Sequence, residues 1–486
     1  MSLPTQQAAA ADLLGRLTGA RPIETHISAV FVGPDEVLKL KKAVALGFLD
    51  FSTLAARERF IRREFAVNQV FAPGIYRGVV PVVRGADGAL ALGGPGDVVD
   101  WVLRMAPVPA ADFLDEMAAR GALAPALLDQ LADAVVAMQA RQPAVAVDAP
   151  AELRRVLLGN QAAAERAGVP RAAEWAARAL AWLDRLAPWL AERAAGGFVR
   201  RCHGDLHLGN LCLWEGKPTP FDALEFDEAM ATVDTGYDLA FLLMDLDMRA
   251  GRAAANRVLN RHVARTGDVA LLRGLPLWLS LRGIIRAHVA AARGQDAQPC
   301  LDYAMAALAP APPRLVAVGG LPGTGKSTLA RALAPLLGAA PGALVLRSDE
   351  IRKRRAGVAP EQRLPAESYT AEASAAVFAE LGAQARVALA AGQAVVADAA
   401  FLRAEERAAI AAAAADFSGL WLTAPLEVLR PRVAARQGDA SDATVPVLEA
   451  AAARDPGPLD WTVLDAAGDA FSAACGVLRI SARDLC

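Results

Sequence analysis

The stretch GLPGTGKST, residues 320–328, decides the fold of the part of the chain that contains it. It fits the pattern G-x-x-x-x-G-K-[ST] without a gap, and its closely spaced glycines let several backbone N–H groups point at one phosphate. The apolar run 315–318 before it predicts a buried strand, and residues 329–337 after it predict a helix. The positive N-terminal end of such a helix attracts a phosphate. The stretch therefore predicts a nucleotide site between a strand and a helix.

The residue types of this loop match the parts of a bound nucleotide. Lys326 would reach the β- and γ-phosphates, and the hydroxyl group of Ser327 would hold Mg²⁺. The other loop residues expected to contact the nucleotide are Gly320, Gly323, Thr324, Gly325 and Thr328. By itself the loop does not distinguish a kinase from an ATPase or a GTPase.

The last part of the chain alternates short apolar runs with alanine-rich segments. After residues 315–318, the apolar runs are 343–346, 394–397, 419–422 and 461–464. This alternation predicts a parallel sheet with helices on both faces. The alanine-rich runs 371–391 and 408–415 contain or adjoin charged residues, so they predict amphipathic helices of a soluble domain.

Charged residues follow several of these runs. Asp349 comes just after the second predicted strand and Asp398 just after the third, at the edge of a parallel sheet where ligands bind. An ordinary helix N-cap is the alternative for Asp349, and a turn at the strand end is the alternative for Asp398. Further on, Arg430, Arg432 and Arg436 are spaced for a mobile helix that closes over a phosphoryl group in transfer.

Residues 314–486 resemble the small P-loop kinases, such as gluconate kinase, chloramphenicol phosphotransferase, polynucleotide 5′-kinase and zeta-toxin-like enzymes. The resemblance rests on the phosphate loop, on SDEIR at 348–352, and on the three arginines followed by QGDASD at 437–442. It implies that Asp349 accepts the proton of a substrate hydroxyl group and that Arg352 helps to place the substrate. The basic run 352–355 has no interleaved aromatic residues, so a solvated helix face is favoured over a nucleic-acid contact.

A second informative stretch is CHGDLHLGN, residues 202–210. Asp205 and Asn210 are five residues apart, the spacing found in H-R-D-x-x-x-x-N. In such a loop the Asp meets the substrate hydroxyl group while the Asn faces the metal ion. Asp222 follows after a predicted strand at 211–214 and a predicted turn at 215–218, where a metal-binding carboxylate is expected.

Residues 20–300 resemble the aminoglycoside phosphotransferase family, which has a kinase-like fold and the loop H-G-D-x-x-x-x-N. The resemblance implies that Asp205 is catalytic, that Asn210 and Asp222 bind the metal, and that Asp238 braces the loop. It also implies that Lys39 binds phosphate and that Glu64 is its helix partner. No G-x-G-x-x-G loop precedes Lys39, and Lys41 and Lys42 compete with it. A non-catalytic kinase-like module therefore stays open as an alternative.

Several other polar residues near this loop have more than one interpretation. His203 and His207 are four residues apart, but without an H-E-x-x-H pattern a loop-bracing role is favoured over a metal pair. Glu225, Asp227 and Glu228 could surround the metal, contact a substrate amine or be solvated carboxylates.

Composition limits the class of protein. The 486 residues carry 51 Lys and Arg against 53 Asp and Glu, a net charge of −2, so no global field gathers nucleic acid or anionic membranes. No apolar stretch is long enough for a membrane span, and no signal peptide is evident. The 5 cysteines lack C-x-x-C spacing, which argues against a disulfide framework or a zinc cluster. We expect a cytoplasmic protein without a membrane partner.

The proline-rich segment 309–314 is the predicted linker of a multidomain α+β and α/β chain. Before it we expect the N-terminal lobe (1–106) and the helical lobe (107–308) of a protein-kinase-like domain, and after it a P-loop domain (315–486). The predicted function is a bifunctional kinase that transfers the γ-phosphoryl group of ATP, with Mg²⁺, to a small-molecule hydroxyl group. A nucleotide-sensing regulator with a kinase-like docking module and a nucleic-acid end kinase are the alternatives.

Overall fold

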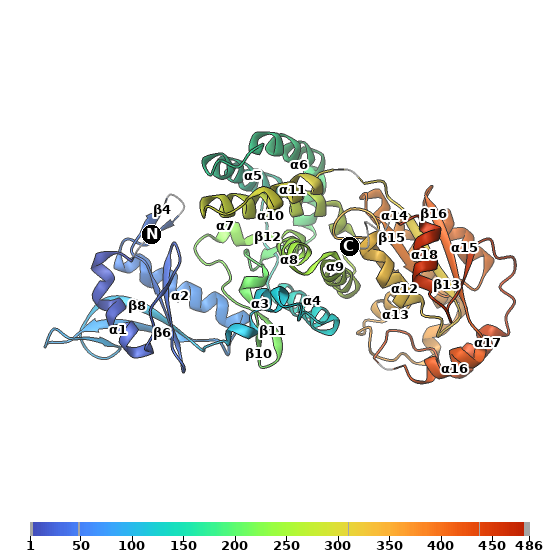
Figure 1. Cartoon of the computed structure of the whole chain (residues 1–486), viewed down its shortest axis with the longest axis horizontal. Coiled ribbons are helices and arrows are strands. Elements are labelled where there is room, and N and C mark those ends of the chain that lie inside the picture. The colour runs from blue at the N-terminus through green and yellow to red at the C-terminus, as the bar shows by residue number, and fades with distance from the viewer. Residues whose placement is uncertain (1–2, 47–48, 310, 437, 481–486) are drawn as a thin grey trace. The chain divides into compact units, whose positions relative to one another are not determined.

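The computed structural model in Figure 1 describes residues 3–46, 49–309, 311–436 and 438–480. The chain divides into two compact units. Unit 1 comprises Met1–Leu123, Ala137–Val147 and Arg193–Asp238, and unit 2 comprises Ala124–Val136, Asp148–Glu192 and Leu239–Cys486. The domain boundaries at 106, 308 and 314 stay predictions. Residue 310 of the expected linker and Gln437 of the QGDASD motif lie outside the described residues.

Unit 1 contains a six-stranded antiparallel sheet with the strand order β1-β2-β3-β8-β6-β7. The strands are β1 (Ile23–Glu24), β2 (Ser28–Val32), β3 (Val37–Lys41), β6 (Tyr76–Arg84), β7 (Leu90–Leu92) and β8 (Asp97–Met105). Helix α1 (Ala8–Thr18) packs against β2, β3 and β7, and helix α2 (Leu54–Phe71) packs against β6 and β8. Thr53 is the N-cap of α2, and its side chain accepts from the backbone N–H of Ala56.

The alternation of β3 decides which side chain reaches which helix. Leu38 and Leu40 belong to the core cluster formed with α1. Because successive side chains of a strand point to opposite faces, Lys39 points to the face covered by α2. The buried residues of α2 are Arg57, Ile61, Glu64 and Asn68, which form one stripe at helical spacing. That stripe places a carboxylate and an amide against the sheet.

The remaining part of unit 1 carries the loop that the sequence singled out. Strands β9 (Val199–Arg201) and β12 (Thr232–Asp234) pair, and β10 (Leu211–Trp214) and β11 (Lys217–Pro220) form a hairpin. The loop of residues 202–210 joins β9 to β10. The predicted turn 215–218 is too long, because Lys217 and Pro218 already pair in β11 and left-handed backbone at Glu215 and Gly216 closes the hairpin. The other short elements are η1 (Thr5–Gln7), β4 (Ala45–Leu46), β5 (Leu49–Asp50), η2 (Ala110–Asp112), α3 (Leu114–Ala119), η3 (Leu208–Asn210) and α7 (Glu228–Ala231).

Unit 2 contains a group of helices and a parallel sheet. The helices before the sheet are α5 (Ala149–Arg166), α6 (Ala172–Ala195), α9 (Arg252–Thr266), η4 (Val269–Arg273), α10 (Leu275–Ala292) and α11 (Gln298–Ala307). Helices α4 (Pro125–Ala140) and α8 (Thr235–Ala250) contribute residues to both units, as does α6 with its last turn. Among the helices of the described residues, none combines the length and the apolar character needed to cross a lipid bilayer.

The five-stranded sheet of unit 2 has the order β14-β15-β13-β16-β17, and all its pairs are parallel. Its strands are β13 (Leu315–Gly320), β14 (Leu344–Arg347), β15 (Val395–Asp398), β16 (Phe417–Thr423) and β17 (Thr462–Asp465). All five predicted strands are therefore present within two residues of their expected ends. The kinase-like α+β part and the parallel sheet of the P-loop part confirm the predicted fold class.

Helices cover both faces of this sheet (Figure 1). Val316 and Val318 face a core shared with α12 (Lys326–Leu333) and α18 (Ala470–Leu478). The other helices are α13 (Ser348–Arg355), α14 (Ala371–Ala390), α15 (Ala404–Ala411), α16 (Leu426–Ala434) and α17 (Val445–Ala452), with short 3₁₀ turns η5 (Ala334–Leu336) and η6 (Ala366–Tyr369). The alanine-rich run 408–415 is helical only to Ala411, and the chain then turns into β16.

Candidate active sites

The phosphate loop joins β13 to α12 in a conformation that requires glycine. Gly320 has φ 135° and Gly323 has φ 86°, both in the left-handed region. A Cβ on Gly320 would lie 2.3 Å from the carbonyl oxygen of Leu422, and one on Gly323 would lie 3.0 Å from that of Leu429. The neighbouring backbone therefore excludes side chains at both positions, which keeps the loop wrapped around the start of α12.

Lys326 is the first residue of α12, and its ammonium group donates to the carbonyl oxygen of Leu321 at 2.9 Å. Burial lowers the pKa of Lys326, although the carboxylates of Asp398 and Asp349 oppose the shift. Ser327 donates its hydroxyl hydrogen to Asp398 Oδ2 at 2.5 Å. Asp398 ends β15 and is 4% exposed, so it is a buried carboxylate beside Ser327 rather than a surface turn residue.

A cavity of about 1330 Å³ brings most of the predicted residues of this half together. Of those predicted from the sequence, its wall contains Gly323, Thr324, Gly325, Lys326, Ser327, Thr328, Asp349, Arg352, Asp398, Arg432 and Arg436. Gly320 does not line it, because this residue is buried against Leu422. Arg430 also lies outside the wall and pairs with Glu449 at 3.0 Å.

Asp349 is the second residue of α13, directly beyond the carboxyl end of β14. The N-cap of this helix is Arg347, so the cap interpretation of Asp349 is wrong. Burial raises the pKa of the Asp349 carboxyl group; the charge of Arg347 opposes the shift, and the charge of Asp398 adds to it. A carboxyl group with a raised pKa inside a cavity has the properties of a general base.

The basic run 352–355 is not a solvated helix face. Arg352 donates to the carbonyl oxygen of Ser368 at 2.8 Å and lies over the ring of Tyr369. Lys353 is fully buried and pairs with Asp442 at 2.6 Å. The last two arginines of the run pair with the carboxylate of Glu380. Lys353 and the last two arginines therefore have acidic partners from distant segments, whereas Arg352 contacts a backbone carbonyl group and an aromatic ring.

Arg347 is a residue of this site that the sequence interpretation missed. It ends β14 with 4% exposure and lies within 3.1 Å of both Ser327 and Asp398. The only sequence signal was an arginine at the end of an apolar strand, directly before the Ser-Asp pair. An arginine at that position gave no indication of its partners.

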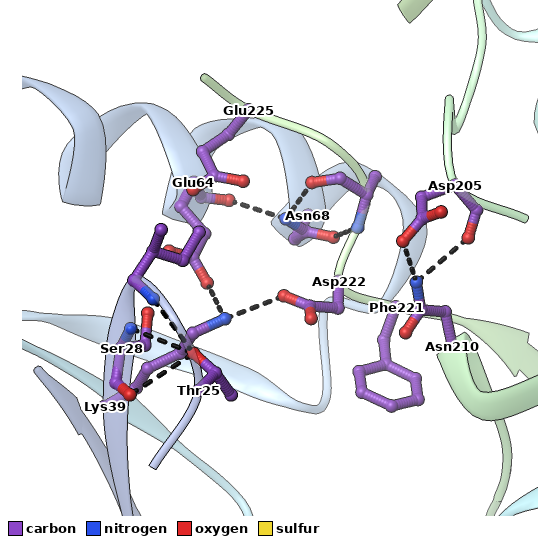
Figure 2. Close-up of polar contacts among 12 residues, drawn as sticks. Thr25, Ser28, Lys39, Glu64, Asn68, Asp205, Asn210, Phe221, Asp222 and Glu225 are labelled. Atoms are coloured by element: carbon purple, nitrogen blue, oxygen red, sulfur yellow. Dashed lines mark hydrogen bonds and ion pairs between the residues drawn. The ribbon is translucent and has the colours of Figure 1, made fainter. Parts of the chain in front are cut away.

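The kinase-like site of unit 1 is drawn in Figure 2. The ammonium group of Lys39 lies 2.7 Å from Glu64 Oε1 and 2.8 Å from Asp222 Oδ1. Burial by itself would lower the pKa of Lys39, but the carboxylates of Asp222 and Glu64 outweigh it and raise the pKa well above its ordinary value. Asn210 donates to Asp205 Oδ2 at 3.0 Å and to its carbonyl oxygen at 2.9 Å.

Asp222 has a left-handed backbone with φ 57°, which costs energy in a non-glycine residue. Two contacts from distant segments hold this conformation. The backbone N–H of Asp222 donates to the hydroxyl group of Tyr76 at 2.9 Å. The next residue, Ala223, donates its N–H to Asn68 Oδ1 at 2.7 Å and accepts from Asn68 Nδ2 at 3.3 Å. Neither Tyr76 nor Asn68 was expected from the sequence.

Lys41 has a larger part in the site than the sequence predicts. Its ammonium group lies 2.7 Å from Glu64 Oε2 and 2.5 Å from Glu225 Oε1. Burial would raise the pKa of Glu64, but Lys39 and Lys41 outweigh it and lower the pKa. Burial raises the pKa of Glu225; Lys41 opposes this shift, and the charge of Glu64 adds to it. Glu64 therefore joins two lysines, and Glu225 is a buried partner rather than a solvated carboxylate.

Asp238 and two histidines hold the backbone of the loop around Asp205. Asp238 accepts from the backbone N–H of Gly204 at 2.9 Å and of His203 at 3.4 Å, as the resemblance implies. Burial lowers the pKa of His203, and its Nε2 lies 2.9 Å from the carbonyl oxygen of Phe221. His207 accepts from the N–H of Gly209 at 3.1 Å. Both histidines thus contact the loop backbone, as the bracing interpretation expects.

The other two acidic residues of the 225–228 segment have separate partners. Asp227 accepts from the backbone N–H of Met230 and caps α7. Glu228 is exposed and pairs with Arg63.

The donor atoms of both sites suit a hard divalent cation. Asn210 uses its amide nitrogen to bond Asp205, which leaves its oxygen as the atom that can bind a metal ion. Asp222, Ser327 and Asp398 likewise supply oxygen, the ligand that Mg²⁺ prefers. Within the described ranges no group of three or more His, Cys, Asp and Glu side chains is placed to hold a metal ion. Mg²⁺ that arrives with nucleotide phosphates needs only one or two carboxylates from the protein.

Two family models match the chain. The model described as "Phosphotransferase enzyme family" matches residues 48–284, and the model described as "AAA domain" matches residues 315–456. Uncharacterized proteins of Mycobacterium tuberculosis and Mycobacterium bovis are 29% identical over 473 residues, which cover 92% of this chain and 92% of theirs.

Solved structures resemble each half separately. A gluconokinase from Sinorhizobium meliloti is 23% identical with a TM-score of 0.26 and covers 36% of this chain and 95% of its own. A choline/ethanolamine kinase family protein from Mesorhizobium loti is 15% identical with a TM-score of 0.36 and covers 63% of this chain and 94% of its own. The chain is a fusion of an aminoglycoside phosphotransferase-like domain with a P-loop kinase domain, as the two sequence resemblances predict.

Proposed function

We propose that each half of this chain transfers the γ-phosphoryl group of ATP, with Mg²⁺, to a hydroxyl group of a small molecule. The observation that carries the proposal is the cavity of unit 2, whose wall contains Lys326, Ser327 and Asp349. It therefore offers a cation for phosphate, an oxygen ligand for a metal ion and a carboxylate with a raised pKa. Phosphoryl transfer needs mainly such positioning and charge stabilisation.

In the P-loop half, the loop N–H groups and Lys326 bind the phosphates, and Ser327 with Asp398 holds the metal ion. Mg²⁺ neutralises charge on the phosphates when it is bound. Asp349 takes the proton of the acceptor hydroxyl group as the new oxygen–phosphorus bond forms and the bond to the β-phosphate oxygen breaks. Arg432 and Arg436 stabilise the charge on the transferring group.

In the kinase-like half, Lys39 binds phosphate and is oriented by Glu64. Asp222 and Asn210 hold the metal ion, and Asp205 accepts the proton of the acceptor hydroxyl group. In the state that Figure 2 depicts, Lys39 pairs with Asp222 at 2.8 Å, so both residues must exchange partners when a nucleotide and a metal ion arrive.

The test is a phosphate-transfer screen of the full chain with γ-labelled ATP across a library of hydroxyl-bearing metabolites. Four proteins are compared: the parent, Lys326→Ala, Asp205→Asn and the double variant. We expect Lys326→Ala to remove one set of acceptors, Asp205→Asn to remove another, and the double variant to remove both. Circular dichroism checks that each variant is folded.

The outcomes separate the two halves. Unchanged turnover in Lys326→Ala would remove the C-terminal half from the kinases. Unchanged turnover in Asp205→Asn would leave the kinase-like half as a docking module. The full chain is preferred over two halves cut at the linker, because α9 contacts the edge of the P-loop sheet through Asn256 and Asn260.

A further inference from the structure

Arg347 ends β14 with its guanidinium group enclosed by side chains from separate segments. One nitrogen, Nη2, donates to Ser327 Oγ at 3.0 Å and to Asp439 Oδ1 at 2.7 Å. Nε donates to Asp398 Oδ2 at 3.1 Å, and Nη1 donates to Glu350 Oε1 at 3.0 Å. Arg347 therefore contacts Ser327 and Asp398, the segment after α16, and helix α13, which follows it directly.

The charges around Arg347 keep it ionised. Burial would lower the pKa of Arg347, but the carboxylates of Glu350, Asp398 and Asp439 outweigh it and raise the pKa further. A planar guanidinium group offers five donors in a fixed arrangement, whereas lysine offers one compact charge on a flexible chain. Lysine at this position would keep the charge and lose the simultaneous contacts.

The hydrogen bonds of Ser327 leave one lone pair of its hydroxyl oxygen for a metal ion. Its hydroxyl group has one hydrogen to donate and two lone pairs to accept with. The hydrogen goes to Asp398, and one lone pair takes an N–H of Arg347. The second lone pair then has a fixed direction. Arg347 and Asp398 together decide where the Ser327 oxygen can bind a cation.

Asp439 extends this arrangement to Arg436. Its Oδ1 accepts from Arg347, and its Oδ2 lies 3.8 Å from Nε of Arg436. In the same segment, Asp442 accepts from Lys353 at 2.6 Å and from Tyr369 at 2.5 Å. Asp439 therefore lies between the two arginines, with its shorter contact to Arg347.

We propose that Arg347 is a positioning residue of the P-loop site with two effects. It orients Ser327 and Asp398 for the metal ion, and through Asp439 it keeps Arg436 at the nucleotide cavity. This inference rests on the proposed function of the C-terminal half. It assigns Arg347 no direct contact with the transferring atoms.

The test uses full-length protein carrying Asp222→Asn, so that the metal site of the other half does not contribute. ATP affinity is measured by calorimetry with Mg²⁺ and with a chelator, and transfer is measured in single turnovers. We expect Arg347→Lys to reduce the gain in ATP affinity due to Mg²⁺ by about 10- to 100-fold, the usual cost of removing a residue that orients a metal ligand. Affinity without Mg²⁺ should stay near that of the parent, because Lys326 and the loop N–H groups are intact.

Asp439→Asn tests the second effect and keeps the shape of the side chain. It should retain the gain due to Mg²⁺ and reduce the single-turnover rate by at least about tenfold, because Arg436 loses its anchor. Glu380→Gln is the matched control, since Glu380 pairs with two arginines of the same helix α13 outside the cavity wall. It should leave both measurements unchanged.

The results distinguish three cases. A merely structural role would lower ATP affinity equally with and without Mg²⁺, and that result in Arg347→Lys overturns the inference. If Arg347→Lys does not fold, Asp439→Asn decides, and a parental transfer rate in that variant overturns the inference. If the parent shows no ATP binding that Lys326→Ala removes, the proposed function of this half fails instead.

Discussion

At the scale of single residues, the carboxylates of the two candidate sites differ in their surroundings and hydrogen-bond partners. In the P-loop half, burial raises the pKa of Asp349, which faces the cavity shared with the phosphate loop. In the kinase-like half, Asp205 is bonded to Asn210 while Asp222 is bonded to Lys39. Carboxylates with such different partners should respond differently to substitution.

The first prediction concerns Asp349. Asp349→Asn should keep near-parental ATP affinity, because Lys326 and Ser327 supply the phosphate and metal contacts. Transfer to the acceptor should fall by about two or more orders of magnitude, since general-base help is typically worth about 10²- to 10⁴-fold. Calorimetry and single-turnover transfer are the two measurements. A variant that loses ATP binding but transfers normally at saturating ATP would make Asp349 a nucleotide ligand instead.

The same residue predicts a pH dependence. A general base must be ionised, so the transfer rate should fall as the pH drops through the pKa of Asp349. Because burial raises that pKa, the acidic limb should lie above about pH 4, the ordinary value for an aspartate. The rate measured against pH should show this limb in the parent. The residual rate of Asp349→Asn should be flat over the same range.

The second prediction separates Asp205 from Asp222. Asp222→Ala should lose Mg²⁺-dependent nucleotide binding in the kinase-like half, because an oxygen ligand is removed. Asp205→Ala should keep binding and lose transfer, because only the proton acceptor is removed. Both are measured in the Lys326→Ala background, so that the P-loop site does not contribute. If both variants bind and react like that background, the docking-module interpretation is favoured.

At the scale of elements, α9 covers the edge of the parallel sheet in unit 2. β14 is the outermost strand, and an edge strand presents unpaired backbone groups. Asn260 Oδ1 accepts from the N–H of Val345 at 2.6 Å, and Asn256 Nδ2 donates to the carbonyl oxygen of Ala343 at 2.9 Å. Two side-chain amides thus satisfy backbone groups at the start of the strand that carries Arg347 and directly before it.

The third prediction follows from this contact. Asn260→Ala should lower the free energy of unfolding by about 1–3 kcal/mol, because the buried N–H of Val345 loses its acceptor. Urea denaturation monitored by tryptophan fluorescence measures the change. The control is Gln161→Ala on the exposed side of α5, which removes an exposed hydrogen bond to Glu165. It should change stability by less than about 0.5 kcal/mol.

At the scale of the whole molecule, an ion-pair network joins the helices of unit 2 to its P-loop part. Asp133 of α4 accepts from Arg261 and Arg265 of α9 at 2.8 Å. The same arginines reach Glu361, beyond α13, at 2.8 and 3.1 Å. Burial would raise the pKa of Asp133, but the hydrogen bonds from Arg265 and Arg261 outweigh it and lower the pKa to about 2.

The fourth prediction is a pH dependence of stability. Because the folded-state pKa of Asp133 is lower than the ordinary value of about 3.9, its contribution is complete above about pH 4. It should be lost as the pH falls from about 4 to 2. Asp133→Asn should be less stable than the parent at pH 7, and the difference should shrink on acidification. A difference that stays constant from pH 7 to pH 2 would contradict the role of this carboxylate.

The sequence by itself determined the features whose signal lies within a short stretch. The strand, glycine loop and helix around residues 320–328 are encoded by neighbours, as are the helix Leu54–Phe71 and the position of Asp349 after its strand. The family resemblance of the N-terminal part likewise implies that Lys39 pairs with Glu64, and that pair is formed. Local sterics and periodicity decide such features, so they can be predicted from a single sequence.

Only the tertiary structure decided which charges meet. Arg347 finds Asp398 and Asp439 from segments 51 and 92 residues away, and Lys41 finds Glu225 at a separation of 184 residues. The sequence predicted a solvated helix face for Arg352 and Lys353. In the folded chain Arg352 donates to the carbonyl oxygen of Ser368, and Lys353 pairs with Asp442. A buried charge is stable only beside its partners, and the folded chain, not any local pattern, sets which side chains become neighbours.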